Sequence, residues 1–234
     1  MKKVITLSAS TLALLVAGAT GVSAVSAASV TATQWNSTGT VAFTENTTTP
    51  PDVTNPEVPG ETGPGGTPGS LAIDYASDLD FGTHAISASQ ETYYANPDSQ
   101  AFSKSVAAFV EMHDLRGLGT GNSTQLTVTQ LAQFNNGSAE LNGAALTFSS
   151  GTGVNAGGGS YVPTSVTEFT LTPGTAQNVM STDGTAGQFL TSYGKASDYQ
   201  GTETGGPISL SVPSGSAQAG NYTATLQWDL TTAP

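Results

Sequence analysis

The stretch Tyr222-Thr223-Ala224-Thr225-Leu226-Gln227-Trp228-Asp229-Leu230 decides the fold, because apolar and polar residues alternate along it. One set is Tyr222, Ala224, Leu226, Trp228 and Leu230; the other is Thr223, Thr225, Gln227 and Asp229. A period of two is that of a β-strand with one buried face. A slip of one residue would bury Asp229 and expose Trp228, so the sequence predicts a strongly specified register for this strand.

Similar short runs precede this strand, separated by Gly, Asn, Ser and Pro. The predicted strands are Leu71–Tyr75, Val106–Met112, Gln125–Leu131, Ala144–Phe148, Val166–Leu171, Ile208–Val212 and Tyr222–Leu230. Many short strands with turn signals between them indicate an all-β fold, an antiparallel β-sandwich. We expect long Gly/Ser/Thr-rich loops in it, at Gly151–Gly159 and Thr191–Pro207.

The first 27 residues are typical of a secretory signal peptide. Lys2 and Lys3 form a basic start, Val4–Val22 is mostly apolar and small, and small residues at Val25–Ala27 suit signal peptidase. Polar interruptions leave no apolar span long enough for a membrane anchor. We therefore expect cleavage after Ala27 and a secreted protein.

The residues after the leader divide into three parts. Residues 28–44 form a short N-terminal segment with one candidate strand, Gly39–Phe43. Residues 45–70 are rich in Pro, Gly and acidic residues, which predicts an extended linker, because such a segment has little apolar surface to bury. Residues 71–234 then hold the folded domain.

Composition and charge exclude several classes of function. The chain has 5 basic and 17 acidic residues, a net charge of −12, and removal of Lys2 and Lys3 leaves 3 − 17 = −14. So acidic a protein lacks the clustered cations that nucleic acid or anionic lipid requires. The absence of cysteine excludes disulfides, thiolate zinc sites and a cysteine nucleophile.

Evidence for catalysis or a metal site is slight. The two histidines, His84 and His113, lack metal-ligand spacing, and His113 is interpreted as a strand-end residue. Asp74, Asp78 and Asp80 could in principle bind calcium, but no known calcium-loop pattern surrounds them. A carboxylate pair for glycoside hydrolysis remains open, because such residues meet only in space. We expect no enzyme activity, no cofactor and no metal.

Four segments together resemble the WxL-domain cell-surface proteins of Gram-positive bacteria, of the small type. They are the S-T-G-T-V-A-F-T-E-N strand with its Pro-rich linker, the D-F-G turn within Ser70–Ile86, the D-x-R-G segment within Val110–Val128, and the motif Y-T-A-T-L-Q-W-D-L at Tyr222–Leu230. The last match is the most specific. The first W-x-L motif is absent, because Thr124 or Asn122 stands at the tryptophan position, depending on the alignment.

The resemblance implies a secreted protein held non-covalently at the cell wall by a C-terminal WxL domain that binds peptidoglycan. The alternative is a structural or adhesive subunit of a surface complex, held there by a WxL-interacting protein. Host surface molecules are a third class of partner, suggested only by the expected location at the cell surface.

The candidate wall- or partner-binding residues are Trp228, Leu230, Tyr222, Leu226, Arg116 and Leu126. For Trp228, the alternation favours a position in the core over a ligand platform. For Arg116, we expect an ion pair with Asp114 or another carboxylate. Asp80 is interpreted as a turn residue that accepts bonds from nearby backbone amides.

Overall fold

A computed structural model describes residues 33, 35, 37–58, 60, 61 and 63–232. The chain divides into two compact units, Met1–Ala42 and Phe43–Pro234. The expected leader lies outside the described residues. Residues 37–46 form neither helix nor strand, so the prediction of a strand at Gly39–Phe43 is wrong. Val41 and Phe43 are 78% and 89% exposed, and no strand among the described residues pairs with this segment.

The second unit is built from short antiparallel strands. They are β1 (Leu71–Ala76), β2 (Glu91–Tyr94), β3 (Phe109–Asp114), β4 (Thr124–Gln130), β5 (Ala145–Phe148), β6 (Gly151–Asn155), β7 (Thr164–Ser165), β8 (Phe169–Thr170), β9 (Gln177–Thr182), β10 (Gly187–Tyr193), β11 (Ile208–Val212) and β12 (Leu226–Thr232). A short 3-10 helix spans Ala196–Asp198. In the part of the chain that the structure describes, no helix is long and apolar enough to cross a membrane.

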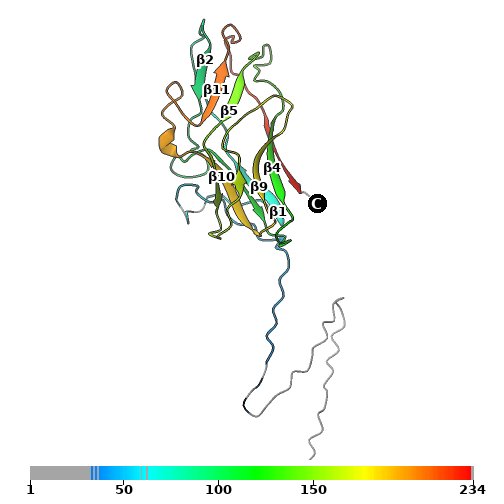
Figure 1. Cartoon of the computed structure of the whole chain (residues 1–234). Helices are drawn as coiled ribbons and strands as arrows, with labels where there is room; N and C mark the ends of the chain where they lie inside the picture. Colours follow the sequence, from blue (N-terminus) through cyan, green and yellow to red (C-terminus); the bar gives the residue numbers. More distant parts are fainter. Residues whose placement is uncertain (1–32, 34, 36, 59, 62, 233–234) are drawn as a thin grey trace, which may run out of the picture. The chain divides into compact units, whose positions relative to one another are not determined.

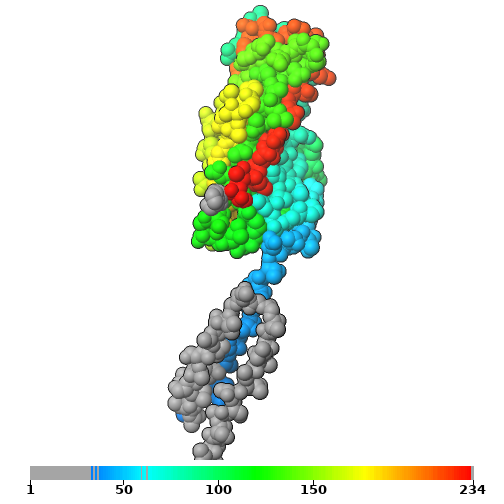
Figure 2. Space-filling model, turned by 90° about the vertical axis from the view of Figure 1, so that its right-hand side faces the viewer, coloured from blue at the N-terminus to red at the C-terminus, as the bar shows by residue number. Residues whose placement is uncertain are grey.

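The strands form three four-stranded sheets, with the orders β1-β3-β10-β6, β2-β11-β5-β8 and β12-β4-β9-β7. In Figure 1 the sheet with β2, β11 and β5 lies at one end of this unit, and β1, β4, β9 and β10 lie toward the other. Figure 2 shows β12, in red, running along the surface. The expected all-β class and antiparallel sandwich arrangement are confirmed.

The loop predicted at Gly151–Gly159 is partly wrong, because Gly151–Asn155 forms edge strand β6. The glycines that suggested a loop instead permit a close approach of two backbones. A Cβ at Gly151 would lie 2.3 Å from the Val166 carbonyl oxygen, and one at Gly153 would lie 2.4 Å from that of Pro163. In the second predicted loop, Thr191–Pro207, the first three residues belong to β10 and the remainder is irregular apart from the short 3-10 helix.

The main hydrophobic core lies between the sheets and takes side chains from all three. β3 explains how the layers are organised, because all six of its residues are buried. Val110 and Met112 face the main core, whereas Phe109 belongs to a second, smaller cluster. By the same alternation, Glu111 and His113 share the face of Phe109. Something must therefore cover the second face of this sheet.

The cover is the segment that was predicted to be a linker. We call residues 51–70 the strap. Val53 is fully buried in the second cluster with Phe109 and Leu190, and the Val53 backbone exchanges bonds with Pro64 and Gly63 (2.9 and 2.6 Å). The expectation of an extended tether is thus wrong for this part of the chain. The proline content indicated that this segment would not pair with a strand. It is nevertheless attached to the sheet, because Val53 is buried against it and the Glu111 side chain accepts a backbone hydrogen bond from it.

Two acids, the buried Glu111 and the exposed Glu57, fasten the strap to the sheet and its flanking segments. The Thr54 backbone N–H donates to the Glu111 carboxyl at 2.9 Å. One carboxylate oxygen of Glu57 accepts from the backbone N–H groups of Ala107 and Ala196, each at 2.8 Å. Polar groups with partners cost little when they are buried. The strap is consequently part of the fold.

An ion pair of two fully buried side chains holds the end of the strap. The His113 ring contacts the Asp74 carboxylate at 2.8 Å through Nδ1 and the Gly69 carbonyl at 2.9 Å through Nε2. Asp74 also accepts from the Thr67 backbone N–H at 2.9 Å. Both groups facing the ring are acceptors, so the doubly protonated imidazolium satisfies both contacts. Although burial opposes the charge, the bonds to Asp74 and Gly69 raise the pKa of His113.

Glu111 is fully buried, and no cation of the described chain pairs with it. Burial is the largest cause that raises the pKa of Glu111, to about 8, and the Asp74 charge adds to it, while the bond from Thr54 acts in the opposite direction. Among the described residues, its Oε1 has no hydrogen-bond partner. At neutral pH the native fold therefore keeps this carboxyl protonated.

We expect the free energy of unfolding to fall as the pH rises from about 5 to 9. Because the unfolded state releases the Glu111 proton near pH 4.5 and the folded state only near 8, ionisation favours unfolding across that window, by about 4 kcal/mol in all. The raised pKa of His113 has the same sign, because its stabilisation is lost as the pH rises through the folded value. Urea unfolding at pH 5, 7 and 8.5 measures the slope, and Glu111→Gln should flatten it. An equal slope in that variant would contradict the assignment.

Because the strap is part of the fold, we expect a substitution in it, before the first strand begins, to lower the stability of the domain. Val53→Ala should lower the free energy of unfolding by roughly 1–3 kcal/mol, because it removes a fully buried side chain from the second cluster. Val58→Ala is the matched control, since Val58 lies in the same segment but is 49% exposed. Thermal or urea unfolding compares the two. Identical stability of both variants would mean that the strap is a tether after all.

Candidate functional site

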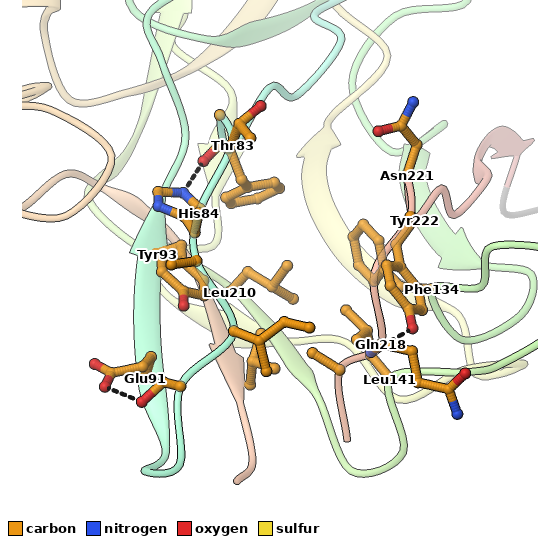
Figure 3. A pocket seen from close by; sticks show the side chains of 18 of the residues that line it. Thr83, His84, Glu91, Tyr93, Phe134, Leu141, Leu210, Gln218, Asn221 and Tyr222 are labelled. Atoms are coloured by element: carbon orange, nitrogen blue, oxygen red, sulfur yellow. Dashed lines mark hydrogen bonds between the residues drawn. The ribbon is translucent and has the colours of Figure 1, made fainter. Parts of the chain in front are cut away.

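A pocket of about 510 Å³ lies at the end that carries β2, β11 and β5. One wall is the loop Leu79–Ser89 with the inner face of β2, and the other is the segment Pro213–Ala224 with Phe134. Apolar side chains, among them Leu141 and Leu210, lie between the two walls (Figure 3). The volume falls within the roughly 300–1,000 Å³ typical of small-ligand sites.

The first wall is ordered by a turn and an aromatic stack. Asp80 accepts from the backbone N–H of Gly82 (2.9 Å), whose φ is +80°, and from the Asn96 side-chain amide (3.0 Å); these bonds lower the pKa of Asp80. The interpretation of Asp80 as a turn residue is confirmed. Beyond the turn, the His84 ring stacks on Tyr93 with the centroids 3.8 Å apart.

Both ring nitrogens of His84 are occupied. Nδ1 lies 2.9 Å from a carboxylate oxygen of Glu203, and Nε2 lies 2.6 Å from the Phe81 carbonyl oxygen. The His84 side chain is 12% exposed, whereas that of Glu203 is 72% exposed. These contacts fix the ring plane, and with it the plane of Tyr93 at the pocket wall.

The second wall is an extension of the last strand. Before β12 begins, Thr223 and Asn135 exchange two backbone hydrogen bonds of 2.9 and 3.0 Å, which align Tyr222 beside Phe134 (Figure 3). The Tyr222 hydroxyl accepts from the Gln218 backbone N–H at 2.9 Å. Phe134 also meets Phe81 of the first wall edge to face, with the centroids 6.3 Å apart. The aromatic rings of the pocket are therefore held in place by their neighbours.

The chemistry of the pocket suits binding more than catalysis. Its acidic side chains are Asp80 and Glu91, and its histidine, His84, is paired with Glu203. None of the residues lining the pocket is Lys or Arg. An anionic ligand would thus be repelled, whereas a neutral ligand with one apolar face and several hydroxyl groups could stack on the rings and bond to polar groups at the rim.

The acidic triplet of the sequence does not assemble into a metal site. Asp74 forms an ion pair with His113, and Asp80 accepts a hydrogen bond from the Gly82 backbone N–H within its own turn. Across residues 37–58 and 63–232 and the few others described, no group of three or more His, Asp or Glu side chains is placed to hold a metal ion.

The predicted site residues on the last strand have mixed positions. Tyr222 lines the pocket, whereas Leu226, Trp228 and Leu230 are half-buried and pack against the main core from β12. Trp228 pairs with Val128 and Leu230 with Leu126, both fully buried on β4. The register is confirmed by the pairing with β4, and the alternation is confirmed as far as Trp228, because Thr223, Thr225 and Gln227 are exposed. Asp229, expected on the exposed face, is half-buried, and the regular strand begins at Leu226 and not at Tyr222. Leu126 is a core residue, with no surface to offer a ligand.

Arg116 has the structural role that the sequence suggested. It binds the Asp114 carboxylate through Nε and Nη2 at 2.9 and 2.7 Å. Nη2 also donates to the hydroxyl of Thr124 at 2.7 Å. Thr124 is fully buried. It stands at one of the two positions where the family resemblance would place the first tryptophan, and here it completes a buried polar cluster with Asp114 and Arg116. Neither Arg116 nor Leu126 approaches the pocket.

Sequence reasoning missed most of the pocket, including His84, Tyr93 and Phe134. β2 escaped prediction because it has only four residues, although the run Glu91-Thr92-Tyr93-Tyr94 contains the β-branched and aromatic residues typical of strands. Phe134 lies outside every strand. It is placed next to Tyr222 because the following residue, Asn135, exchanges backbone hydrogen bonds with Thr223. No local signal brings these rings together.

Comparison with protein-family models gives a match over most of the chain. A family model described as the WxL domain, surface cell wall-binding, matches residues 30–234. The match begins well before residue 71, so the placement of this domain in the C-terminal part alone is wrong. The physical reason is that the strap, which precedes residue 71, packs on the sheet and so belongs to the same domain. No curated protein and no solved structure matches the chain.

We expect Trp228 to act mainly on stability. Trp228→Ala should lower the free energy of unfolding by about 2 kcal/mol, less than for a fully buried tryptophan, because the side chain is only half-buried on an edge strand. Gln227→Ala, on the exposed face of the same strand, should change it by less than about 0.5 kcal/mol. Urea unfolding followed by circular dichroism tests both. Equal stability of the two variants would point to a ligand platform.

Proposed function

Because this chain belongs to the WxL family of surface domains that bind the cell wall, we propose that it binds peptidoglycan through the aromatic pocket beside Tyr222. The observation that carries the proposal is the double role of Tyr222. This residue begins the strand motif that is most characteristic of the family resemblance, and its ring lines the pocket. The pocket is thereby joined to the strand that fixes the fold.

The composition of the pocket supports a glycan ligand. Sugar rings have apolar C–H faces and polar edges, and the pocket offers aromatic side chains with hydroxyl and amide groups nearby. The net charge of −12 and the acidic pocket argue against the anionic polymers of a Gram-positive wall as the direct ligand. Non-covalent attachment then rests on stacking and hydrogen bonds.

We infer a binding protein with no catalytic activity. Both histidines have each ring nitrogen engaged by an oxygen acceptor, His84 by Glu203 and Phe81, and His113 by Asp74 and Gly69. Neither is free to take a proton from a substrate in this arrangement. The proposed setting is a secreted protein on the outer surface of a Gram-positive cell, with the signal peptide removed.

The edge of β12 favours a second candidate function, a subunit of a surface complex. β12 pairs with β4 on one side, and no strand of the described chain pairs with its other edge. Free backbone groups on such an edge can accept a strand from another protein. A WxL-interacting protein is the proposed partner, and both functions can coexist because the edge and the pocket are different surfaces.

We expect Tyr93→Ala to lose binding to purified peptidoglycan from which anionic polymers have been removed. The change removes an aromatic wall of the pocket and the support of His84. Tyr94→Ala is the matched control, because Tyr94 is the next residue of β2, is also half-buried, and does not line the pocket. Co-sedimentation measures binding, and circular dichroism with thermal unfolding checks that each variant is folded.

We expect at least roughly tenfold weaker binding for folded Tyr93→Ala, equivalent to about 1.4 kcal/mol, and unchanged binding for Tyr94→Ala. Equal binding by both folded variants would remove the pocket from the wall-binding surface. Absence of binding by the unaltered protein, restored by a co-expressed partner, would favour the second function.

A further inference from the structure

The segment before the strap has the pattern of a strand but no strand to pair with. Val41 and Phe43 alternate with Thr40, Ala42 and Thr44, so an extended chain here places its two large apolar side chains on one face. Both side chains are largely exposed. Valine, threonine and phenylalanine all favour strands. Within the described chain, this apolar face is therefore left without a cover.

The segment joins the domain at the end of the sheet where β12 finishes. The Asn46 backbone N–H donates to the Leu115 carbonyl at 3.3 Å. The next residue after Leu115 is Arg116, which donates to Thr124, and Thr124 pairs with Thr232 at the end of β12. Asn46 thus fixes the C-terminal end of the segment close to the last residue of β12.

This anchor decides between two ways in which residues 37–44 could pair with β12. On their own β12 they would run parallel to it, because their C-terminal end is fixed where β12 finishes. The strand pairs of the described sheets are all antiparallel, and parallel pairing is slightly less stable per residue. The β12 of a second molecule imposes no such direction, so it can accept the segment as an antiparallel strand.

The outer edge of β12 has backbone groups available for such a strand. The Thr225 carbonyl accepts from the Leu131 N–H at 2.9 Å, so Thr225 and every second residue after it direct their backbone groups toward β4. The residues between them, Leu226, Trp228 and Leu230, direct theirs the other way, where no strand of the described chain pairs with them. Free N–H and C=O groups on an edge strand are the groups to which an added strand bonds.

Side chains at the same edge are covered incompletely. β12 and β1 are edge strands of different sheets, and they lie near one another (Figure 2). Their apolar residues at this edge are half-buried, Leu226, Trp228 and Leu230 on β12 and Leu71 and Ile73 on β1. A strand added beside β12, with its apolar face turned toward the core, would cover part of this surface.

Charge permits two such acidic molecules to meet at this place. The chain has a net charge of −12, so two copies repel one another over most of their surfaces. Residues 37–44 contain no charged side chain, and Leu226–Thr232 contains only Asp229. A contact between these two segments therefore brings few like charges together.

From these observations we propose that residues 37–44 of one molecule add as an antiparallel strand to the outer edge of β12 in a second molecule. The donor segment and the acceptor edge are different surfaces, so each molecule can give one strand and accept another. Repetition of this contact links molecules head to tail. The inference goes beyond the proposed function, because wall binding through the pocket does not require it. A WxL-interacting protein on the same edge would compete with the second copy.

Light scattering after size-exclusion chromatography of the chain without its first 27 residues tests the association. We expect the molar mass of the unaltered protein to rise above that of one molecule as the protein concentration increases. Val41→Asp should weaken the association at least roughly tenfold, because it places a charge on the apolar face of the donor strand. Val162→Asp is the matched control, since Val162 is also an exposed valine and lies outside both segments, so it should associate like the unaltered protein.

Nuclear magnetic resonance locates the acceptor edge. The 15N-labelled Val41→Asp protein retains β12 and has an impaired donor segment, and unlabelled unaltered protein is added to it. We expect amide shift changes in Leu226–Thr232. Addition of unlabelled Val41→Asp protein at the same concentrations should leave these amides unchanged.

Four results would overturn the inference. The first is the mass of a single molecule at every concentration, and the second is equal association of Val41→Asp and the unaltered protein. The third is a set of shift changes that leaves β12 out, or that separates the two proteins independently of concentration, because the segment would then pair with its own β12. The fourth is a change in β12 that only a WxL-interacting protein produces, which would assign the edge to that protein. All four leave wall binding through the pocket as proposed.

Discussion

The alternation of side chains from Tyr222 to Trp228 is the constraint on which the rest of the structure depends. A single register places Leu226, Trp228 and Leu230 against the main core and, further up the same chain, Tyr222 in the pocket wall. Moving the strand by one residue would remove both sets at once. The motif therefore connects stability with the proposed binding surface, to which only its first aromatic residue, Tyr222, belongs.

A second constraint comes from burying charge in a protein with few cations. Sheet β1-β3-β10-β6 has two buried faces, and the outer face carries Glu111 and His113. The strap covers them, supplying a backbone N–H to Glu111 and a carbonyl to His113. Removal of the strap would expose the second cluster and take away backbone hydrogen-bond partners of Glu111, His113 and Asp74. Residues 51–70 are thus a layer of the domain, which fits a family match that begins at residue 30.

The sequence predicted what local periodicity can encode. Ile208–Val212 and the register of the last strand agree with the structure, as does the pair of Arg116 with Asp114. The glycines at Gly151–Asn155 indicated a loop, whereas they are there because two backbones approach closely. The prolines of the strap indicated a linker, so the burial of Val53 was not predicted. The pocket could not be predicted, because its rings come from separate segments that meet only in the folded chain. The sequence singled out Tyr222 and the turn Asp80-Phe81-Gly82, but nothing in it placed them near each other.

The central claim is that the ligand contacts the pocket at the Tyr222 end of the last strand, while the Trp228 end supports the core. Amide chemical shifts of the 15N-labelled protein, recorded during titration with soluble peptidoglycan fragments, test it most directly. The account predicts shift changes concentrated in Leu79–Tyr93 and Pro213–Ala224. Changes confined to Gln227–Thr232 and the neighbouring residues of β4 would contradict it and make Trp228 the contact residue.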